Sequence, residues 1–180
     1  MNIFVQSRCA LLLILSPLGI AFSQTNPANV PRPPTAELAK FKPFLGKYDV
    51  SGDFAKLPWT GTLELAPAIK GWFVEQTILV KSQGIDREFR MLVTWDPTER
   101  KYRAWRFQTL PIGKTNEAEF RFEGTEMITE WVYDNEDGSK TTARNRYYWV
   151  SEDRLEILST VKVGDQPERQ LGVLVGRRRK

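Results

Sequence analysis

The sequence predicts an all-β fold: an antiparallel barrel of about 8–10 strands with a short N-terminal helix. From Gly46 onward, apolar and polar residues alternate, which is typical of strands with one face in an apolar interior and the other in water. Turn-forming residues recur about every 8–12 positions with no convincing helix between them, so neighbouring strands should be antiparallel. Closure into a barrel removes the exposed edges of an open sheet. A β-sandwich is the alternative.

Residues 1–23 have the features of an export signal. Arg8 provides a positive charge before an apolar run from Cys9 to Phe22, and the small residues Ala21 and Ser23 suit cleavage after Ser23. The run is shorter than the roughly 18 apolar residues of a membrane span, although an uncleaved anchor is the alternative interpretation. We therefore expect an exported protein, periplasmic or secreted, that is not an integral membrane protein.

A Pro-rich linker is predicted for residues 24–36, between the signal and a barrel domain at residues 37–180. Its four prolines lie among polar residues, which indicates an extended segment. Thr35 is suited to cap a short helix that continues to about Phe41 and ends before Pro43. This helix either plugs one end of the barrel or is a frayed leader, and both interpretations fit the sequence.

The alternation is clearest in four segments of the barrel domain. Their apolar positions are Leu63 and Leu65; Phe89, Met91, Val93 and Trp95; Ala118, Phe120 and Phe122; and Leu155, Ile157, Val161 and Val163. Each set should face the interior of the barrel. Between two aromatic segments, Asp137-Gly138 predicts a β-hairpin. The acidic residues around it also suit calcium, but their spacing does not fit a calcium-binding loop and favours a simple turn.

Composition excludes several kinds of chemistry. The 180 residues include no histidine, and the single cysteine, Cys9, lies in the predicted signal. Serine–histidine–aspartate triads, thiol nucleophiles, histidine-ligated zinc and histidine-bound haem all need side chains that the mature protein would lack. We expect no metal and no cofactor. The net charge is +4, but Arg177–Lys180 carry four of the positive charges, so no basic face for nucleic acid is indicated.

The two ends of the barrel domain resemble a known signature. Phe44-Leu45-Gly46-Lys47-Tyr48 opens the first predicted strand, and the basic cluster Arg177–Lys180 follows the last. This is similar to the lipocalin-like (calycin-type) pattern, in which Gly-x-Trp opens the barrel and an arginine of the final strand stacks on the aromatic ring. Here Tyr48 stands where tryptophan is usual.

More narrowly, the chain resembles an uncharacterised family of secreted bacterial lipocalin-like β-barrel domains of unknown function. The resemblance lies in Gly71-Trp72-Phe73-Val74-Glu75-Gln76, in the hairpin from Thr94-Trp95-Asp96-Pro97 to Lys101-Tyr102, and in the basic last strand. It covers about residues 37–180. Because the family has no established chemistry, the resemblance implies the fold and the secreted location and assigns no site.

Five residues are candidates for ligand contact inside the barrel: Tyr102, Trp105, Arg106, Arg146 and Tyr148. An arginine beside a tyrosine in a low-dielectric interior suits the polar end of a ligand, because the guanidinium fork fits two oxygens. The alternative is that the neighbouring apolar residues face inward, which would leave Arg146 and Tyr148 in solvent. The alternation favours this alternative, whereas Arg106 fits either face. We predict no catalytic residue.

These features favour a secreted or periplasmic, non-catalytic β-barrel that binds a small hydrophobic or amphipathic molecule. One alternative is a structural or interaction domain whose barrel is filled with aromatic side chains and holds no ligand. A carboxylate-dependent enzyme is the third possibility, because Glu75, Glu119 and Glu130 lie within predicted strands. Cavity volume separates the first two hypotheses, since an interior packed with rings has no room for a ligand.

Overall fold

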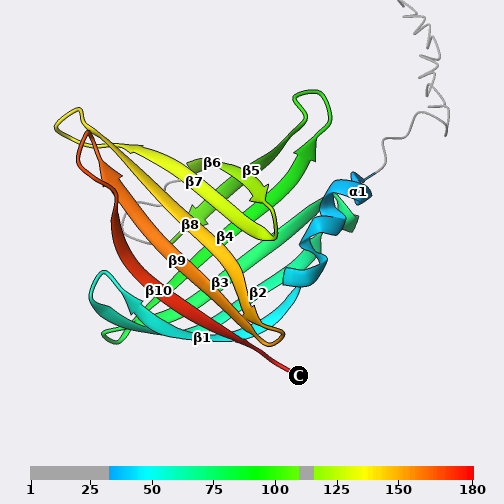
Figure 1. Ribbon diagram of the computed structural model, residues 1–180, viewed down its shortest axis with the longest axis horizontal. Coiled ribbons are helices and arrows are strands. Elements are labelled where there is room, and N and C mark those ends of the chain that lie inside the picture. The colour runs from blue at the N-terminus through cyan, green and yellow to red at the C-terminus, as the bar shows by residue number, and fades with distance from the viewer. Residues whose placement is uncertain (1–32, 110–115) are drawn as a thin grey trace, which may run out of the picture. The chain divides into compact units, whose positions relative to one another are not determined.

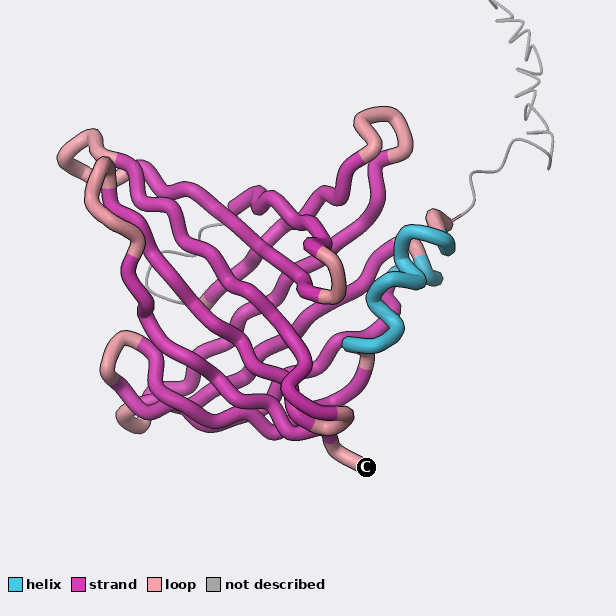
Figure 2. The backbone as a smooth tube through the Cα atoms, in the orientation of Figure 1, coloured by secondary structure: helices cyan, strands magenta, loops and turns pink. Residues whose placement is uncertain are grey.

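The computed structural model describes residues 33–109 and 116–180, which form ten antiparallel strands that close into one barrel. The strands are β1 (Gly46–Phe54), β2 (Leu57–Ala68), β3 (Phe73–Ser82), β4 (Ile85–Asp96), β5 (Lys101–Gln108), β6 (Asn116–Glu123), β7 (Glu126–Asp134), β8 (Lys140–Ser151), β9 (Arg154–Val163) and β10 (Arg169–Arg178). Each strand pairs with its neighbours in the chain, and β1 pairs with β10 to close the barrel (Figures 1 and 2). The predicted fold class is confirmed. The predicted export signal and residues 24–32 of the predicted linker lie outside the described residues.

Inner and outer faces alternate along the strands, as the sequence predicts. In β4, Phe89, Met91 and Val93 are buried in the interior, whereas Arg90 between them is exposed. Burying such apolar side chains contributes roughly 25 cal/mol for each Å² removed from water, so the alternation itself fixes which face turns inward. A shift of one residue in any strand pairing would expose the whole apolar set.

Two glycines allow close approach of neighbouring strands. A Cβ atom on Gly61 of β2 would lie 1.9 Å from the carbonyl oxygen of Leu79 in β3. A Cβ atom on Gly172 of β10 would lie 2.0 Å from the carbonyl oxygen of Asp53 in β1. Any other residue at these positions would push the strands apart, so glycine is required where the neighbouring backbone comes this close.

The hairpin predicted at Asp137-Gly138 is confirmed. It connects β7 to β8, and Gly138 adopts a φ of 80°, the left-handed conformation that glycine favours. The backbone N–H of Ser139 donates a hydrogen bond of 2.9 Å to Oδ1 of Asp137. This carboxylate therefore stabilises the turn, as acidic residues commonly do between strands.

A short helical segment precedes the first strand. Helix α1 (Thr35–Leu38) continues directly into the 3₁₀ helix η2 (Ala39–Phe44). Thr35 is the first helical residue and not the cap, because Pro34 takes the cap position and no side chain caps this end. Pro43 lies inside η2 and does not end it, since the fixed φ of proline is compatible with a 3₁₀ turn. Within the described residues, no helix is long and apolar enough to cross a membrane.

This helical segment closes one end of the barrel, which we call the plugged end. The aromatic side chains that pack together at the plugged end are Phe41, Phe44, Tyr48, Tyr102, Phe120, Phe122 and Trp149. The ring of Phe41 is stacked on Phe120 with 5.1 Å between centroids and meets Phe122 edge-on at 5.0 Å, which are favoured geometries for aromatic pairs. Phe41 is 1% exposed. The helix is therefore a plug, and the frayed-leader interpretation is wrong.

Arg178 of β10 seals the plugged end. Its guanidinium lies over the rings of Tyr48, at 5.3 Å, and Trp149, at 4.9 Å. It donates hydrogen bonds to the carbonyl oxygens of Leu45 and Pro43, at 3.1 and 2.5 Å, and to the hydroxyl of Tyr48 at 3.0 Å. Tyr48 thus receives a cation, and Arg178 is the member of the basic cluster Arg177–Lys180 that stacks on it.

Candidate ligand-binding site

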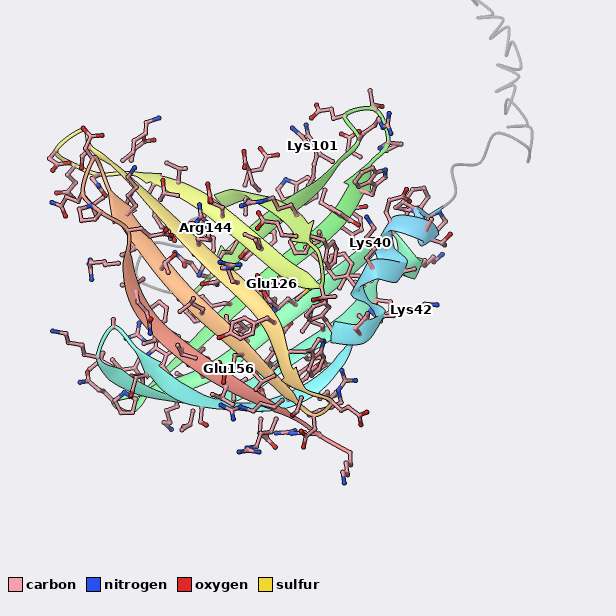
Figure 3. All side chains as sticks on the ribbon, viewed as in Figure 1. Lys40, Lys42, Lys101, Glu126, Arg144 and Glu156 are labelled. Carbon is pink, nitrogen blue, oxygen red and sulfur yellow. The ribbon has the colours of Figure 1, made fainter. Side chains whose placement is uncertain are left out.

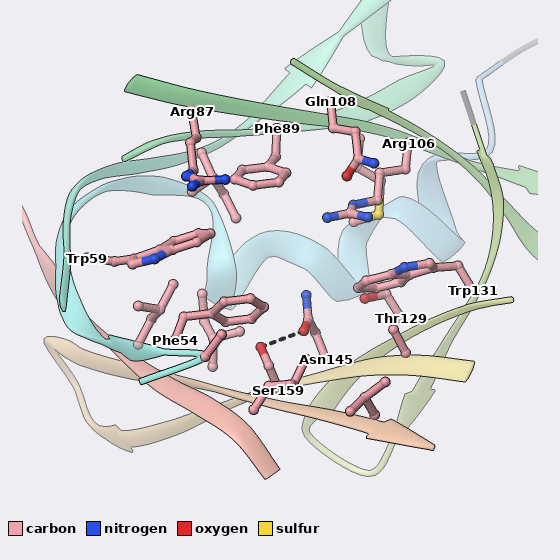
Figure 4. A pocket seen from close by; sticks show the side chains of 18 of the residues that line it. Phe54, Trp59, Arg87, Phe89, Arg106, Gln108, Thr129, Trp131, Asn145 and Ser159 are labelled. Carbon is pink, nitrogen blue, oxygen red and sulfur yellow. Dashed lines mark hydrogen bonds between the residues drawn. The ribbon is translucent and has the colours of Figure 1, made fainter. Parts of the chain in front are cut away.

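The interior of the barrel beyond the plugged end contains a cavity of about 390 Å³. The seven aromatic residues of the plugged end are absent from its wall. Strand β1 shows the division, because Tyr48 lies in the plugged end and Phe54, at the other end of the strand, lines the cavity. Apolar and aromatic side chains form most of the wall, with polar groups at a few positions (Figure 4). This composition is typical of small-molecule sites.

Arg106 of β5 reaches into the cavity among aromatic rings. The central carbon of its guanidinium lies 4.2 Å from the centre of the Trp131 ring and 5.3 Å from that of Phe89. The guanidinium donates a hydrogen bond of 3.0 Å to the hydroxyl of Tyr133, which also accepts one from the indole N–H of Trp131. Among the residues that the structure describes, Arg106 forms no other side-chain hydrogen bond and no ion pair. Ring faces therefore stabilise its charge, and several N–H groups are left without partners.

Arg87 of β4 is a second cation of the cavity, and the sequence-based candidates do not include it. Its guanidinium lies 5.6 Å from the centre of the Trp59 ring, and its Nε is buried with no hydrogen-bond partner among the described residues. Phe89 stacks on Trp59 with 5.8 Å between centroids and also contacts Arg106. The rings of Trp59 and Phe89 therefore lie between the two arginines, because Arg87 contacts Trp59. A signal existed in the sequence: Arg87 precedes Phe89 and Met91 with the period of two that marks the inner face.

A polar wall completes the cavity, and sequence reasoning missed it as well. Figure 4 shows Asn145 and Ser159 across the pocket from the arginines, with Oγ of Ser159 donating a hydrogen bond of 2.7 Å to Oδ1 of Asn145. The hydroxyl of Tyr147 donates to Oε1 of Gln76 at 3.2 Å. Burial raises the pKa of Tyr147, which keeps the hydroxyl protonated. Gln76 is 5% exposed, and within residues 33–109 and 116–180 its Nε2 has no hydrogen-bond partner.

Two of the five candidate residues face the interior of the barrel. Arg106 lines the cavity, as described above. Tyr102 belongs to the plugged end and does not line the cavity. Its hydroxyl donates a hydrogen bond of 2.9 Å to the carbonyl oxygen of Glu37, and burial raises its pKa to about 12. The side chain of Tyr102 therefore holds the helical plug in place.

Trp105 faces outward. Its ring packs against Phe73 on the outer surface, with 6.1 Å between centroids. The inner positions of β5 belong to Tyr102, Ala104 and Arg106, and successive residues of a strand point to opposite faces. The prediction that Trp105 contacts a ligand inside the barrel is corrected by this alternation.

Arg146 and Tyr148 of β8 also face outward, as the alternative interpretation of this strand expects. The guanidinium of Arg146 donates to Oε2 of Glu126 at 2.6 Å, and the hydroxyl of Tyr148 donates to Oε2 of Glu156 at 2.8 Å. Figure 3 labels both glutamates on their strands, and the alternation with the buried Met127, Leu155 and Ile157 places them on the outer face. Tyr147 occupies the inner face between the two residues. Arg146 and Tyr148 are therefore surface partners of carboxylates, away from the cavity.

The strand carboxylates considered for catalysis lie on the outer face. Glu119 and Glu130 are directly opposite each other in the β6–β7 pairing, and Glu130 accepts a hydrogen bond of 2.8 Å from Arg144. Glu75 lies 3.7 Å from Arg90. No acidic side chain of the described residues lines the cavity, and none of their acidic groups is clustered to hold a metal ion. A carboxylate-dependent reaction within the cavity therefore has no carboxylate there to carry it.

Comparison with known proteins supports the fold alone. No protein-family description and no curated protein matches this chain. Among solved structures, Rv2717c from M. tuberculosis is similar, with a TM-score of 0.54 and 13% sequence identity over 79% of this chain and 97% of that chain. A de novo designed fluorescence-activating β-barrel aligns with a TM-score of 0.39 and 17% identity, over 77% of this chain and 95% of the design.

Proposed function

We propose that this protein is a non-catalytic binding barrel that holds one small amphipathic molecule in its cavity. The observation that carries the proposal is the cavity of about 390 Å³ inside a barrel whose other end is packed with rings. Small-molecule sites commonly enclose roughly 300–1,000 Å³. Trp59, Phe89 and Trp131 offer apolar surface for the body of the ligand, and the arginines and the polar wall offer partners for its polar end.

A wholly filled, structural barrel is the competing function. The plugged end fits it, because Phe41 and Phe44 occupy the interior there. The rest of the interior supports binding instead, because open space lies beside buried donors on Gln76 and Arg87 that have no partner among the described residues. A barrel selected only for stability would be expected to fill this volume with apolar side chains, since unpaired buried polar groups each cost about 1–3 kcal/mol.

We further propose that the protein acts after export, as a secreted or periplasmic lipocalin-like barrel. The signal features of residues 1–23 support this location. The test is fractionation of the host followed by N-terminal sequencing. We expect the chain in the periplasm or medium to begin at Gln24. A chain that begins at Met1 and stays with the cytosol would overturn the proposed location and leave the binding function untouched.

Native mass spectrometry of protein purified gently from its host tests the binding function. We expect a stoichiometric adduct that is lost on denaturation and recovered in the small-molecule extract. The control pair is Ala143→Phe and Thr142→Phe. Ala143 lines the cavity, and its neighbour Thr142 points to the opposite face. The first variant should lose the adduct, and the second should keep it.

The absence of a bound molecule would contradict the binding function. A bare protein mass, together with no change of tryptophan fluorescence on addition of fatty acids or isoprenoids, would favour the structural barrel. Circular dichroism of both phenylalanine variants verifies that they are folded. If Ala143→Phe does not fold, Ala143→Leu adds less volume to the same position and replaces it in the comparison.

A further inference from the structure

We infer that the polar end of the ligand is an oxyanion, such as a carboxylate, bound by the guanidinium groups of Arg106 and Arg87. The inference rests on the proposed function and adds the charge of the ligand to it. Its basis is the arrangement of charges and hydrogen-bond donors in the cavity. Three observations support it, and all of them concern residues of the cavity wall.

The first observation is an uncompensated positive charge. Arg87, Arg90 and Arg106 border the cavity, although the side chain of Arg90 lies on the outer face, and no aspartate or glutamate of the described residues borders it. Arg90 is neutralised on the outer face by Glu88, at 2.5 Å. Arg87 and Arg106 have no ion-pair partner in the described part of the chain, and residues 1–32 and 110–115 contain no acidic side chain. A partly buried, unpaired guanidinium is costly, so an anion that enters this cavity is stabilised.

The second observation is a surplus of donors. Three cavity-lining atoms are buried without a hydrogen-bond partner in the described structure: Nε1 of Trp59, Nε2 of Gln76 and Nε of Arg87. All three carry N–H groups, which can only donate. The amide oxygens of Gln76 and Asn145 already accept hydrogen bonds from Tyr147 and Ser159. The unpartnered groups of the cavity therefore need acceptors, and an oxyanion supplies several on one group.

The third observation is the position of the two cations. Figure 4 shows Arg87 and Arg106 entering the pocket from the same side, with Phe89 between them and Asn145 across the pocket. Phe89 contacts both Trp59 and Arg106. An oxyanion held by the two guanidinium groups would leave its apolar body against the rings of Trp59 and Trp131. The same cavity thus provides for both parts of an amphipathic anion.

A head-group series tests the inference. Decanoate, decyl sulfate, 1-decanol and decylamine share a ten-carbon body and differ in the charge of the polar end. Titration calorimetry against the purified barrel should show both anions binding roughly 10- to 100-fold more tightly than 1-decanol, which is the usual worth of a charge-assisted hydrogen-bond pair. Decylamine should bind most weakly, because its ammonium group meets two cations.

Variants assign the preference to the two arginines. Arg87→Met and Arg106→Met, singly and together, should reduce the preference for decanoate over 1-decanol while 1-decanol still binds. Arg146→Met is the matched control, because Arg146 is paired with Glu126 on the outer face. It should leave the preference unchanged.

The outcomes separate this inference from the function on which it rests. Equal binding of 1-decanol and decanoate would overturn the inference and leave the binding barrel intact. A preference that survives the double variant would overturn the assignment to Arg87 and Arg106. If none of the four compounds binds, the amphipath-binding function fails together with the inference.

Discussion

Arg178 and Arg106 stand in similar aromatic surroundings at opposite ends of the barrel. Arg178 lies over Tyr48 and Trp149, and Arg106 lies over Phe89 and Trp131. The difference is in their oxygen partners. Two backbone carbonyl oxygens and a hydroxyl accept from Arg178. A single hydroxyl accepts from Arg106 within the described residues.

This difference teaches that stacking on rings does not by itself distinguish a structural arginine from a binding one. At the plugged end, the chain supplies the oxygens through the helical segment, whose Pro43 and Leu45 carbonyls face Arg178. In the cavity, the strands supply rings, and several of their buried donors have no partner among the described residues. We expect mutations in the plugged end to change the free energy of unfolding, and mutations in the cavity to change affinity.

The largest effect should come from removing the centre of the plug. Phe41→Ala should lower the free energy of unfolding by about 3–5 kcal/mol, because Phe41 is 1% exposed and contacts the rings of Tyr102, Phe120 and Phe122. Urea titration measures the loss. Phe54→Ala in the cavity wall is the control and should cost less than half as much, because Phe54 is only half-buried. Equal losses would contradict the division of the barrel into two regions.

The next largest effect on the free energy of unfolding should come from replacing Arg178, and replacing Arg106 should have less effect. Arg178→Met should cost about 2 kcal/mol, because the carbonyl oxygens of Pro43 and Leu45 lose their donor. Arg106→Met should change stability by less than about 1 kcal/mol, because it removes a charge that has one hydrogen bond and no counterion. Thermal and urea unfolding of the two variants provide the measurement. A larger loss for Arg106→Met would mean that Arg106 is structural.

Enlarging two inward-facing alanines should have smaller effects on stability, and the effects should differ between the two positions. Ala104 is fully buried and does not line the cavity, whereas Ala143 lines it. Ala104→Leu should destabilise the barrel by about 1–2 kcal/mol through overpacking. Ala143→Leu has space for the added methyl groups and should be neutral or slightly stabilising, but it should weaken ligand binding. Comparable destabilisation by both substitutions would argue against open space beside Ala143.

The sequence predicts the barrel because the alternation of apolar and polar residues can be recognised within each strand separately. Alternation places Phe89, Met91 and Val93 inside, and the same period would have placed Arg87 and Gln76 with them. Neither residue has an arginine–tyrosine pair beside it in its strand, which is the pattern that selects the candidate residues of the sequence. The same pattern selects Trp105 for the cavity, in a strand with aromatic residues on both faces.

The division of the interior into a packed plugged end and an open cavity could not be predicted from the strands alone. It depends on which rings meet across the barrel, and Phe41 reaches Tyr102 and Phe120 from a helical segment far away in sequence. Alternation assigns a residue to the inner face but does not say whether the space in front of it is filled. Two of the acceptors that bind Arg178 are backbone carbonyl oxygens, which no residue pattern reveals.

The smallest effect should be a change in how stability falls at alkaline pH when Tyr102 is replaced. Its measurement tests whether water is excluded from the plugged end. Burial raises the pKa of Tyr102 from 10.0 to about 12, so the unfolded chain loses this proton at lower pH than the folded protein. The stability that neutral Tyr102 contributes is fully present below pH 10 and should fall as the pH rises from 10 to about 12. Tyr48 and Tyr147, whose pKa values are also raised by burial, act in the same direction. Tyr102→Phe should therefore flatten this decline without abolishing it, as measured by melting temperature against pH. An unchanged slope would mean that water reaches Tyr102, and the plugged end would then differ from the cavity less than its packed rings suggest.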